Sequence, residues 1–336
     1  MKNVLVVGAG GFAGGFIVEE GLRRGYRVWA GIRASTSRRY LTDSRIQFVT
    51  FDFDADDAPA SLAASLRESA PEGGWDWIIY NLGATKCLRF SDFSRINCDY
   101  LRNFIDALHA ADLVPRRFLY LSSLSAMGPG VKRSYEPFTE TMVPQPNTRY
   151  GTSKLKAEMT LQMSGLPYII FRATGLYGPR DHDYFLMFKS IRKGFDFSVG
   201  YRRQQLTFLY ITDLASAIFD ALEKAPTGET YNVAHPAAYT QSQFRSMASA
   251  VMGKRLVIPV KVPLAGLKLV CAIAEKIGVV RGKPSTLNRD KYNIMAQRNW
   301  NVSVDKARRD FGFDPKVDLR EGIERSVEWY KKEGWL

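Results

Sequence analysis

Residues 4–14 read VLVVGAGGFAG, a run of four apolar residues followed directly by a turn rich in glycine. An uninterrupted apolar run is typical of a strand that is buried on both faces. Glycines allow the unusual backbone angles of a tight turn and the close approach of a phosphate, and a helix N-terminus adds partial positive charge. The stretch therefore predicts a strand, a dinucleotide-binding turn and a helix. The expected cofactor-binding residues of the turn are Gly8, Gly11, Phe12, Ala13 and Gly14.

Strand-like and helix-like patterns alternate beyond this turn. Strands are expected at residues 4–7, 26–32, 46–51, 77–82, 118–122, 168–172 and, as the last one, 229–234. Helices are expected at residues 12–25, 59–70, 92–111, 148–163, 183–193 and 211–224. Such alternation predicts an α/β fold, a Rossmann-type doubly wound parallel sheet with helices on both faces. The dinucleotide-binding domain should comprise residues 1–178 and about 205–235, and a smaller substrate lobe residues of about 179–204 and 236–336.

The composition is that of an ordinary globular protein of 336 residues, 46% apolar and 24% charged. This composition excludes disordered, fibrous and disulfide-dense proteins. The three cysteines lack the spacing of a metal site and there are only three histidines, so we expect no metal and a reduced, cytoplasmic setting. The sequence contains no uninterrupted apolar stretch of about 18 residues, so we expect no membrane-spanning helix.

The formal net charge of +13 indicates an anionic partner, either a phosphorylated cofactor, a membrane surface or nucleic acid. The basic residues are scattered in pairs and form no nucleic-acid-binding motif. We therefore expect a small-molecule substrate and no nucleic acid.

Basic residues follow the second expected strand, where an acidic residue would bind the ribose hydroxyls of NAD. Arg33, with Ser35 and Arg38 nearby, instead suits the 2′-phosphate of NADP. The alternative is a solvated basic loop, so NADP(H) is the preferred cofactor and NAD(H) remains possible.

Tyr150 and Lys154 lie four residues apart in an expected helix, a spacing that places both side chains on one helix face. A free phenol has a pKa near 10, which is too high for proton exchange at neutral pH. A neighbouring ammonium group and an oxidised nicotinamide would lower that pKa. Ser122 and Ser123 end a preceding strand, and a serine there can bind a substrate carbonyl.

These motifs together resemble the extended short-chain dehydrogenases/reductases of the NAD-dependent epimerase/dehydratase family, with features similar to 3β-hydroxysteroid dehydrogenases. The resemblance covers essentially the whole chain and includes Asn97, residues 171–179, 210–215 and 231–233 and the tail to residue 323. It implies that Tyr150 is the acid/base, that Lys154 tunes Tyr150 and binds the nicotinamide ribose, and that Ser123 orients the substrate oxygen. It further implies that the cofactor contacts Asp52, Phe53, Leu82, Gly83, Ser122 and Ala173. For Asn97 it implies support of proton transfer, and the alternative is that Asn97 caps a helix.

Three functions remain open. The first is NADPH-dependent reduction of a ketone on a hydrophobic or lipid-like substrate, by hydride transfer with Tyr150 as acid. The second is a sugar-nucleotide epimerase or dehydratase that recycles bound NAD(P), with Arg180, Arg202 or Arg203 gripping a diphosphate. The third is a non-catalytic NADP-binding protein.

Residues 262–274 form the most apolar late segment, which is flanked by lysines. This segment predicts a helix that covers a lipid pocket or rests on a membrane surface; the alternative is a helix packed against the main domain. The helices at 92–111 and 148–163 are those through which the family often forms homodimers, although their apolar stripes also fit packing within one chain.

Overall fold

A computed structural model describes residues 1–131 and 134–336, and its core is a seven-stranded parallel sheet in the order β3-β2-β1-β4-β5-β6-β10. The strands are β1 (Asn3–Val7), β2 (Arg27–Ile32), β3 (Gln47–Thr50), β4 (Trp77–Tyr80), β5 (Arg117–Ser123), β6 (Tyr168–Ala173) and β10 (Glu229–Val233). The chain runs outward from β1 to β3 and then returns to the other side of β1. The expected doubly wound sheet is confirmed.

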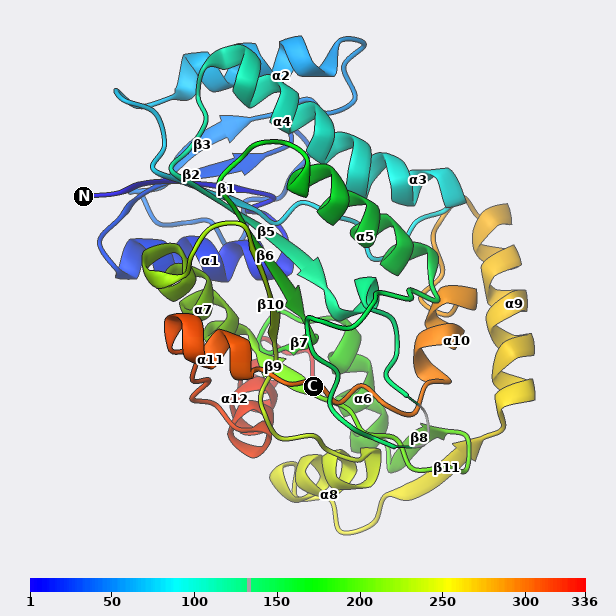
Figure 1. The fold of residues 1–336 in the computed structure, drawn as a ribbon. Coiled ribbons are helices and arrows are strands. Elements are labelled where there is room, and N and C mark those ends of the chain that lie inside the picture. Colours follow the sequence, from blue (N-terminus) through cyan, green and yellow to red (C-terminus); the bar gives the residue numbers. More distant parts are fainter. Residues whose placement is uncertain (132–133) are drawn as a thin grey trace.

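Helices cover both faces of this sheet (Figure 1). One face carries α1 (Phe12–Arg23) and α7 (Ile211–Lys224), and the other carries α2 (Ala58–Ser69), α4 (Tyr100–Ala111) and α5 (Arg149–Gln162). The alternation within β1 shows why its sequence is apolar throughout. Val4 and Val6 belong to the core on the α1 side, whereas Leu5 and Val7 belong to the core on the α4 side.

The expected helix over residues 92–111 is divided. It consists of α3 (Phe90–Ser94), one π-helical turn at Arg95–Asp99, and α4. Asn97 lies buried in that turn, where both its side-chain oxygen and its amide group are bonded to the backbone of Ala84. The extra residue of a π turn frequently marks a functional site.

The remaining elements include strands that the sequence patterns do not predict. They are β7 (Gly175–Tyr177), α6 (Asp183–Arg192), β8 (Phe195–Val199), β9 (Phe208–Tyr210), α8 (Gln241–Val251), β11 (Ile258–Val262), α9 (Leu264–Val280), α10 (Arg289–Met295), α11 (Asp305–Phe311) and α12 (Leu319–Lys332). Because β11 pairs with β8, the expectation that residues 229–234 form the last strand is wrong. Both strands of this pair are short and largely exposed, so no buried apolar run signals them.

In the described part of the chain, the helices are all too short or too polar to cross a bilayer.

Candidate active site

The carboxyl ends of β1 and β4 lie at the point where the strand order reverses, which is where doubly wound sheets bind ligands. The turn after β1 touches the segment after β4. Gly8 has a φ of +85°, and a Cβ on it would lie 2.8 Å from the backbone nitrogen of Leu82. Only glycine therefore fits this position, and Leu82 is held against the glycine-rich turn.

Gly14, on the first turn of α1, packs directly on the same turn. A Cβ on Gly14 would lie 2.3 Å from the carbonyl oxygen of Gly8 and 2.7 Å from the Cα of Ala9. The helix N-terminus consequently lies close to the end of β1, and Gly11 at its N-cap has no side chain that caps the helix. The residues present fit the pyrophosphate of a dinucleotide, because Gly10 and Gly11 are exposed and no side chain caps the N-terminus of α1, where helices leave N–H donors for an anion.

A cavity of about 320 Å³ borders this turn. Arg39 and Arg180 both line it, and one terminal nitrogen of Arg180 is buried without a hydrogen-bond partner among the described residues. The lining residues are Ala9, Gly10, Gly11, Phe12, Gly15, Ser37, Arg39, Tyr40, Leu41, Arg180, His182 and Trp335. A site of this size and charge suits an anionic ligand.

The basic loop after β2 folds over the same turn, since a Cβ on Gly10 would clash with Thr36 at 2.1 Å. Arg33 and Ser35 are exposed, and the Arg33 guanidinium has no hydrogen bond or ion pair with any residue in 1–131 or 134–336. Arg38 differs, because its guanidinium lies 4.1 Å from the centre of the Phe48 ring. The Arg33 guanidinium is thus more available to an anionic ligand than the Arg38 guanidinium.

The expected catalytic residues come together at the end of β5. The Ser123 hydroxyl is hydrogen-bonded to the Tyr150 phenol. The Lys154 ammonium is buried and donates to the carbonyl oxygen of Leu121 at 2.9 Å. A Cβ on Gly83 would lie 3.1 Å from the Lys154 Nζ, so the segment after β4 joins the glycine-rich turn to this group.

Burial governs the charges of this group. Desolvation raises the pKa of Tyr150 to about 12, against the opposing effect of its hydrogen bond to Ser123. Desolvation lowers the pKa of Lys154 to about 8, although the carboxylate of Glu158 acts in the opposite direction. The expected lowering of the tyrosine pKa by the lysine is therefore not found in the protein alone: desolvation dominates the pKa of Tyr150, and only the hydrogen bond to Ser123 opposes it.

Glu158 and Arg172 form a buried ion pair behind the site that sequence reasoning missed. Their closest atoms are 2.6 Å apart, and both side chains are almost wholly buried. The Ser122 hydroxyl donates to Glu158, so this expected cofactor-binding residue directs its side chain to the ion pair. The signal was available in the sequence, because Glu158 continues the four-residue spacing of Tyr150 and Lys154.

The other expected cofactor-binding residues lie in different surroundings. Ala173, on β6, is the cross-strand partner of Ser123. Asp52 is exposed, and its carboxylate accepts the backbone N–H of Asp54 at 3.0 Å. The Phe53 ring is buried and stacks on Tyr100, with ring centres 5.1 Å apart, so it supports the core.

Asn97 acts as a bridge between two segments of the site. Beyond its bonds to Ala84, its amide donates to the Ser153 hydroxyl at 2.9 Å, and that hydroxyl donates to the carbonyl oxygen of Tyr150 at 2.7 Å. This buried Asn therefore ties the segment after β4 to the helix that carries Tyr150.

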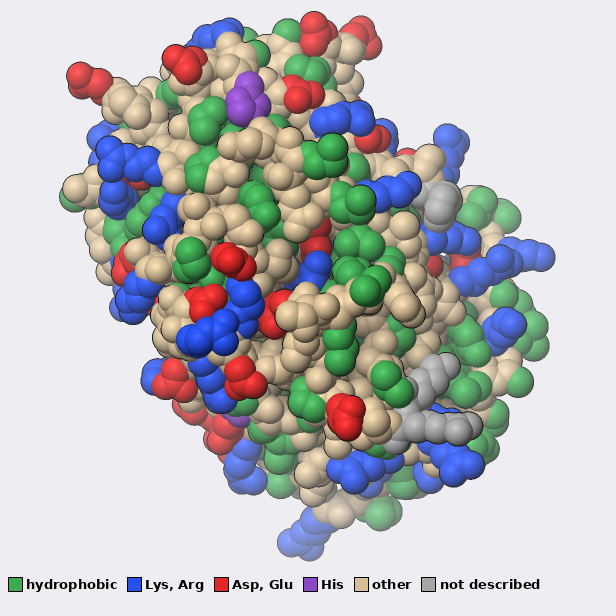
Figure 2. All heavy atoms as spheres, in the orientation of Figure 1, with side chains coloured by type: hydrophobic (Ala, Val, Ile, Leu, Met, Phe, Trp, Pro, Cys, Tyr) green, Lys and Arg blue, Asp and Glu red, His purple; other side chains and the backbone are tan. Residues whose placement is uncertain are grey.

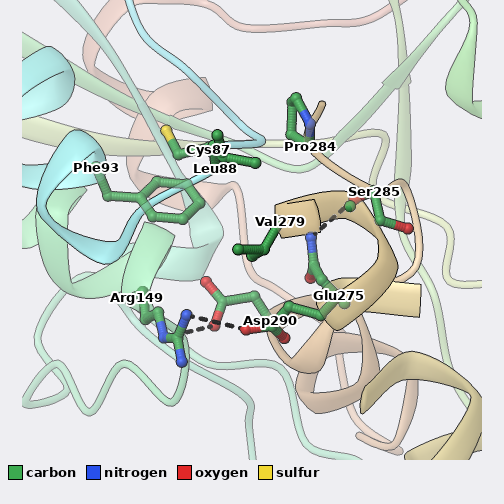
Figure 3. Close-up of a pocket in the computed structure, with 11 residues that line it drawn as sticks. Cys87, Leu88, Phe93, Arg149, Glu275, Val279, Pro284, Ser285 and Asp290 are labelled. Carbon is green, nitrogen blue, oxygen red and sulfur yellow. Dashed lines mark hydrogen bonds and ion pairs between the residues drawn. The ribbon is translucent and has the colours of Figure 1, made fainter. Parts of the chain in front are cut away.

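A small cavity lies beside Arg149, at the start of the helix that carries Tyr150 (Figure 3). Its volume is about 20 Å³, which is room for little more than one water molecule. Phe93 lines it and lies 6.4 Å from the Tyr150 ring, and Asp290 lines it while accepting the Tyr150 N–H. Val279 of α9 also lines the cavity.

Several known proteins resemble the chain over its whole length. A ceramide reductase of Caulobacter vibrioides is 23% identical over 335 residues, which cover 99% of this chain and 96% of the relative. A sterol-4-alpha-carboxylate 3-dehydrogenase (decarboxylating) of Dictyostelium discoideum is 22% identical and covers 96% and 99% of the two chains. The structure of a dTDP-glucose 4,6-dehydratase of Bacillus anthracis with NAD matches with a TM-score of 0.77 at 20% identity, covering 100% and 98%.

The model of one family matches residues 4–234, more than half of the chain. The matched segment contains the glycine-rich turn, the Ser123–Tyr150–Lys154 group and every strand of the central sheet. The chain belongs to the NAD dependent epimerase/dehydratase family, whose enzymes act on CH–OH groups with a nicotinamide cofactor.

Proposed function

We propose that the protein is an NADPH-dependent reductase of a ketone on a lipid-like substrate, such as a sterol-like or long-chain 3-keto compound. One observation carries the chemical part of the proposal. The phenol of Tyr150 is partly buried, hydrogen-bonded to Ser123 and one helical turn from Lys154, at the sheet edge that bears the glycine-rich turn. This arrangement suits proton transfer to a carbonyl oxygen.

The chain's own residues would do the following. The backbone of Gly11 to Ala13 would hold the pyrophosphate, Arg33 the 2′-phosphate, and Lys154 the nicotinamide ribose. When bound, the reduced nicotinamide supplies the hydride. Ser123 would hold the carbonyl oxygen, and Tyr150, which its raised pKa keeps protonated at neutral pH, would donate the proton to that oxygen.

Two observations support a lipid substrate. The relatives named for ceramide and sterol substrates both cover nearly the whole of this chain, including the second lobe beyond the family match. Helix α9, which would cover a lipid-like substrate, is apolar for most of its length. We propose that the second lobe is the substrate-binding lobe.

The test is the oxidation of NADPH by purified protein with a panel of 3-keto steroids and long-chain 3-keto compounds. We expect steady NADPH consumption that Tyr150→Phe abolishes while cofactor binding is retained. Tyr201→Phe is the matched control, because Tyr201 is 67% exposed. Full activity of Tyr150→Phe would contradict the assignment of the proton donor.

A sugar-nucleotide epimerase or dehydratase is the second candidate, favoured by the dTDP-glucose dehydratase structure with the same fold. Such an enzyme would purify with bound cofactor and show no net consumption of NADPH. Arg180 gives this candidate little support, because its guanidinium lies over Phe16 and Tyr40 and pairs with Glu19 of α1.

A further inference from the structure

We propose that the outward face of α9 docks onto the surface of an anionic lipid bilayer. The docking itself depends only on the surface described here. Its use, delivery of a lipid substrate to the site, rests on the proposed function.

The outward face of α9 is an apolar stripe. Leu269, Val270, Ile273, Ile277 and Val280 recur at intervals of one to four residues, and their exposures are 62%, 49%, 49%, 45% and 87%. A surface helix of a globular protein normally presents polar side chains to water. A contiguous apolar stripe that is exposed instead marks a surface for interaction.

The inward face of the same helix is separately accounted for. Leu267, Cys271 and Gly278 are its buried residues, and the first two form a small core of their own with Val199 of β8. The helix is therefore already packed through one side. The exposed apolar stripe is therefore not needed to pack the helix against the rest of the protein.

Positive charge surrounds the stripe and indicates the occupant. Residues 254–283 contain seven basic residues and one acid, and all seven are exposed: Lys254, Arg255, Lys261, Lys268, Lys276, Arg281 and Lys283. The acid, Glu275, is directed inward, where it pairs with Arg149 and Arg289. An apolar helix face with a basic rim matches the interface of a membrane that contains anionic lipids. A second copy of this chain would instead bring the same positive charge to the contact.

The position of α9 links this surface to the active site. Figure 1 shows α9 at the outer edge of the molecule, and Figure 2 shows hydrophobic and basic side chains side by side at that edge. Glu275, Gly278 and Val279 of the helix line the small cavity at the start of the helix that carries Tyr150. A molecule docked through the outward face of α9 would thus hold this cavity next to the bilayer.

The experiment is co-sedimentation of the full chain with phosphatidylcholine vesicles and with vesicles that also contain about 30% phosphatidylglycerol. We expect binding to the anionic vesicles, weakening at high salt because the charges are exposed. Ile273→Glu and the pair Lys268→Glu/Lys276→Glu should each lower binding at least about fivefold. Met163→Glu and Lys224→Glu are the controls, since both residues are exposed on other helix ends, and they should leave binding unchanged.

Absence of binding to the anionic vesicles, or equal binding of the α9 variants and their controls, would overturn the proposal. So would a dimer in vesicle-free solution that Ile273→Glu dissociates, because the stripe would then be an interface between copies. Vesicle binding needs no turnover. Vesicle binding without reductase activity would therefore contradict the proposed function alone. Reductase activity without vesicle binding would contradict the docking alone.

Discussion

The carboxylate of Asp290 accepts the backbone N–H of Tyr150 at 3.1 Å, across 140 residues of sequence. This N–H is in the first turn of α5, where helices leave donors without intrahelical partners. Asp290 also lies 4.0 Å from Arg149. Helix α10 thus holds the start of the helix that carries the expected proton donor.

We expect Asp290→Ala to lower kcat about ten- to hundredfold, because a small displacement of Tyr150 misaligns proton transfer. The lost cap should cost about 1 kcal/mol of the free energy of unfolding. Asp318→Ala removes a comparable cap, on the N–H of Glu321 in α12. That control should lose similar stability and keep its kcat, as measured by steady-state kinetics and urea unfolding. Equal kcat values for the two variants would show that Asp290 only stabilises the fold.

The lowered pKa of Lys154 predicts how the free energy of unfolding changes with pH. The folded protein releases this proton near pH 8, whereas the lysine's ordinary pKa is 10.5. Between these values the unfolded chain binds more protons, so the lysine's contribution to the free energy of unfolding rises with pH, by up to about 3 kcal/mol. The unfolding free energy of the wild type minus that of Lys154→Met should therefore increase from pH 8 to 10.5. Lys156→Met, at an exposed position of the same helix, should show no such trend.

Arg33 makes a prediction about cofactor choice. Arg33→Glu should raise the KM for NADPH about ten- to hundredfold, since it would remove the charge-assisted bond that we propose to the 2′-phosphate and would introduce a like charge. The KM for NADH should change little. Arg38→Ala should have a smaller effect on NADPH, because Arg38 lies against the Phe48 ring. An unchanged ratio of the two KM values in Arg33→Glu would remove the assignment of the 2′-phosphate site.

Alanine should have opposite effects on stability at two glycine positions. Gly14→Ala places a methyl group against the backbone of Gly8 and Ala9, and should cost about 1–3 kcal/mol of stability and impair cofactor binding. Gly266→Ala lies in open space within α9 and should stabilise the protein by up to about 1 kcal/mol. Thermal unfolding and cofactor titration of both variants test this, and a tolerated Gly14→Ala would contradict the close packing of the turn.

Much of the fold was predictable because burial on both faces leaves a strong local signal. The central strands β1 and β4 are apolar almost throughout, and the observed bounds of all seven strands lie within about two residues of those expected. The short pairs β7–β9 and β8–β11 were not predictable, since each joins distant segments through three to five residues. The π turn at Arg95–Asp99 was hidden inside an otherwise amphipathic pattern, and the bonds of its buried Asn97 to Ala84 and Ser153 join segments that are distant in the sequence.

The doubly wound sheet, the glycine-rich turn and the shared helix face of Tyr150 and Lys154 follow from the sequence alone. Each depends on a local property of the chain: the period of the apolar residues, the geometry of glycine or the repeat of the helix. Only the tertiary structure decided that Asp290 caps the helix of Tyr150, that Glu158 pairs with Arg172, and that α9 leaves an apolar stripe exposed. These are properties of contacts between distant segments. Desolvation at such contacts, rather than residue type, sets the charges of the site and the surfaces left for partners.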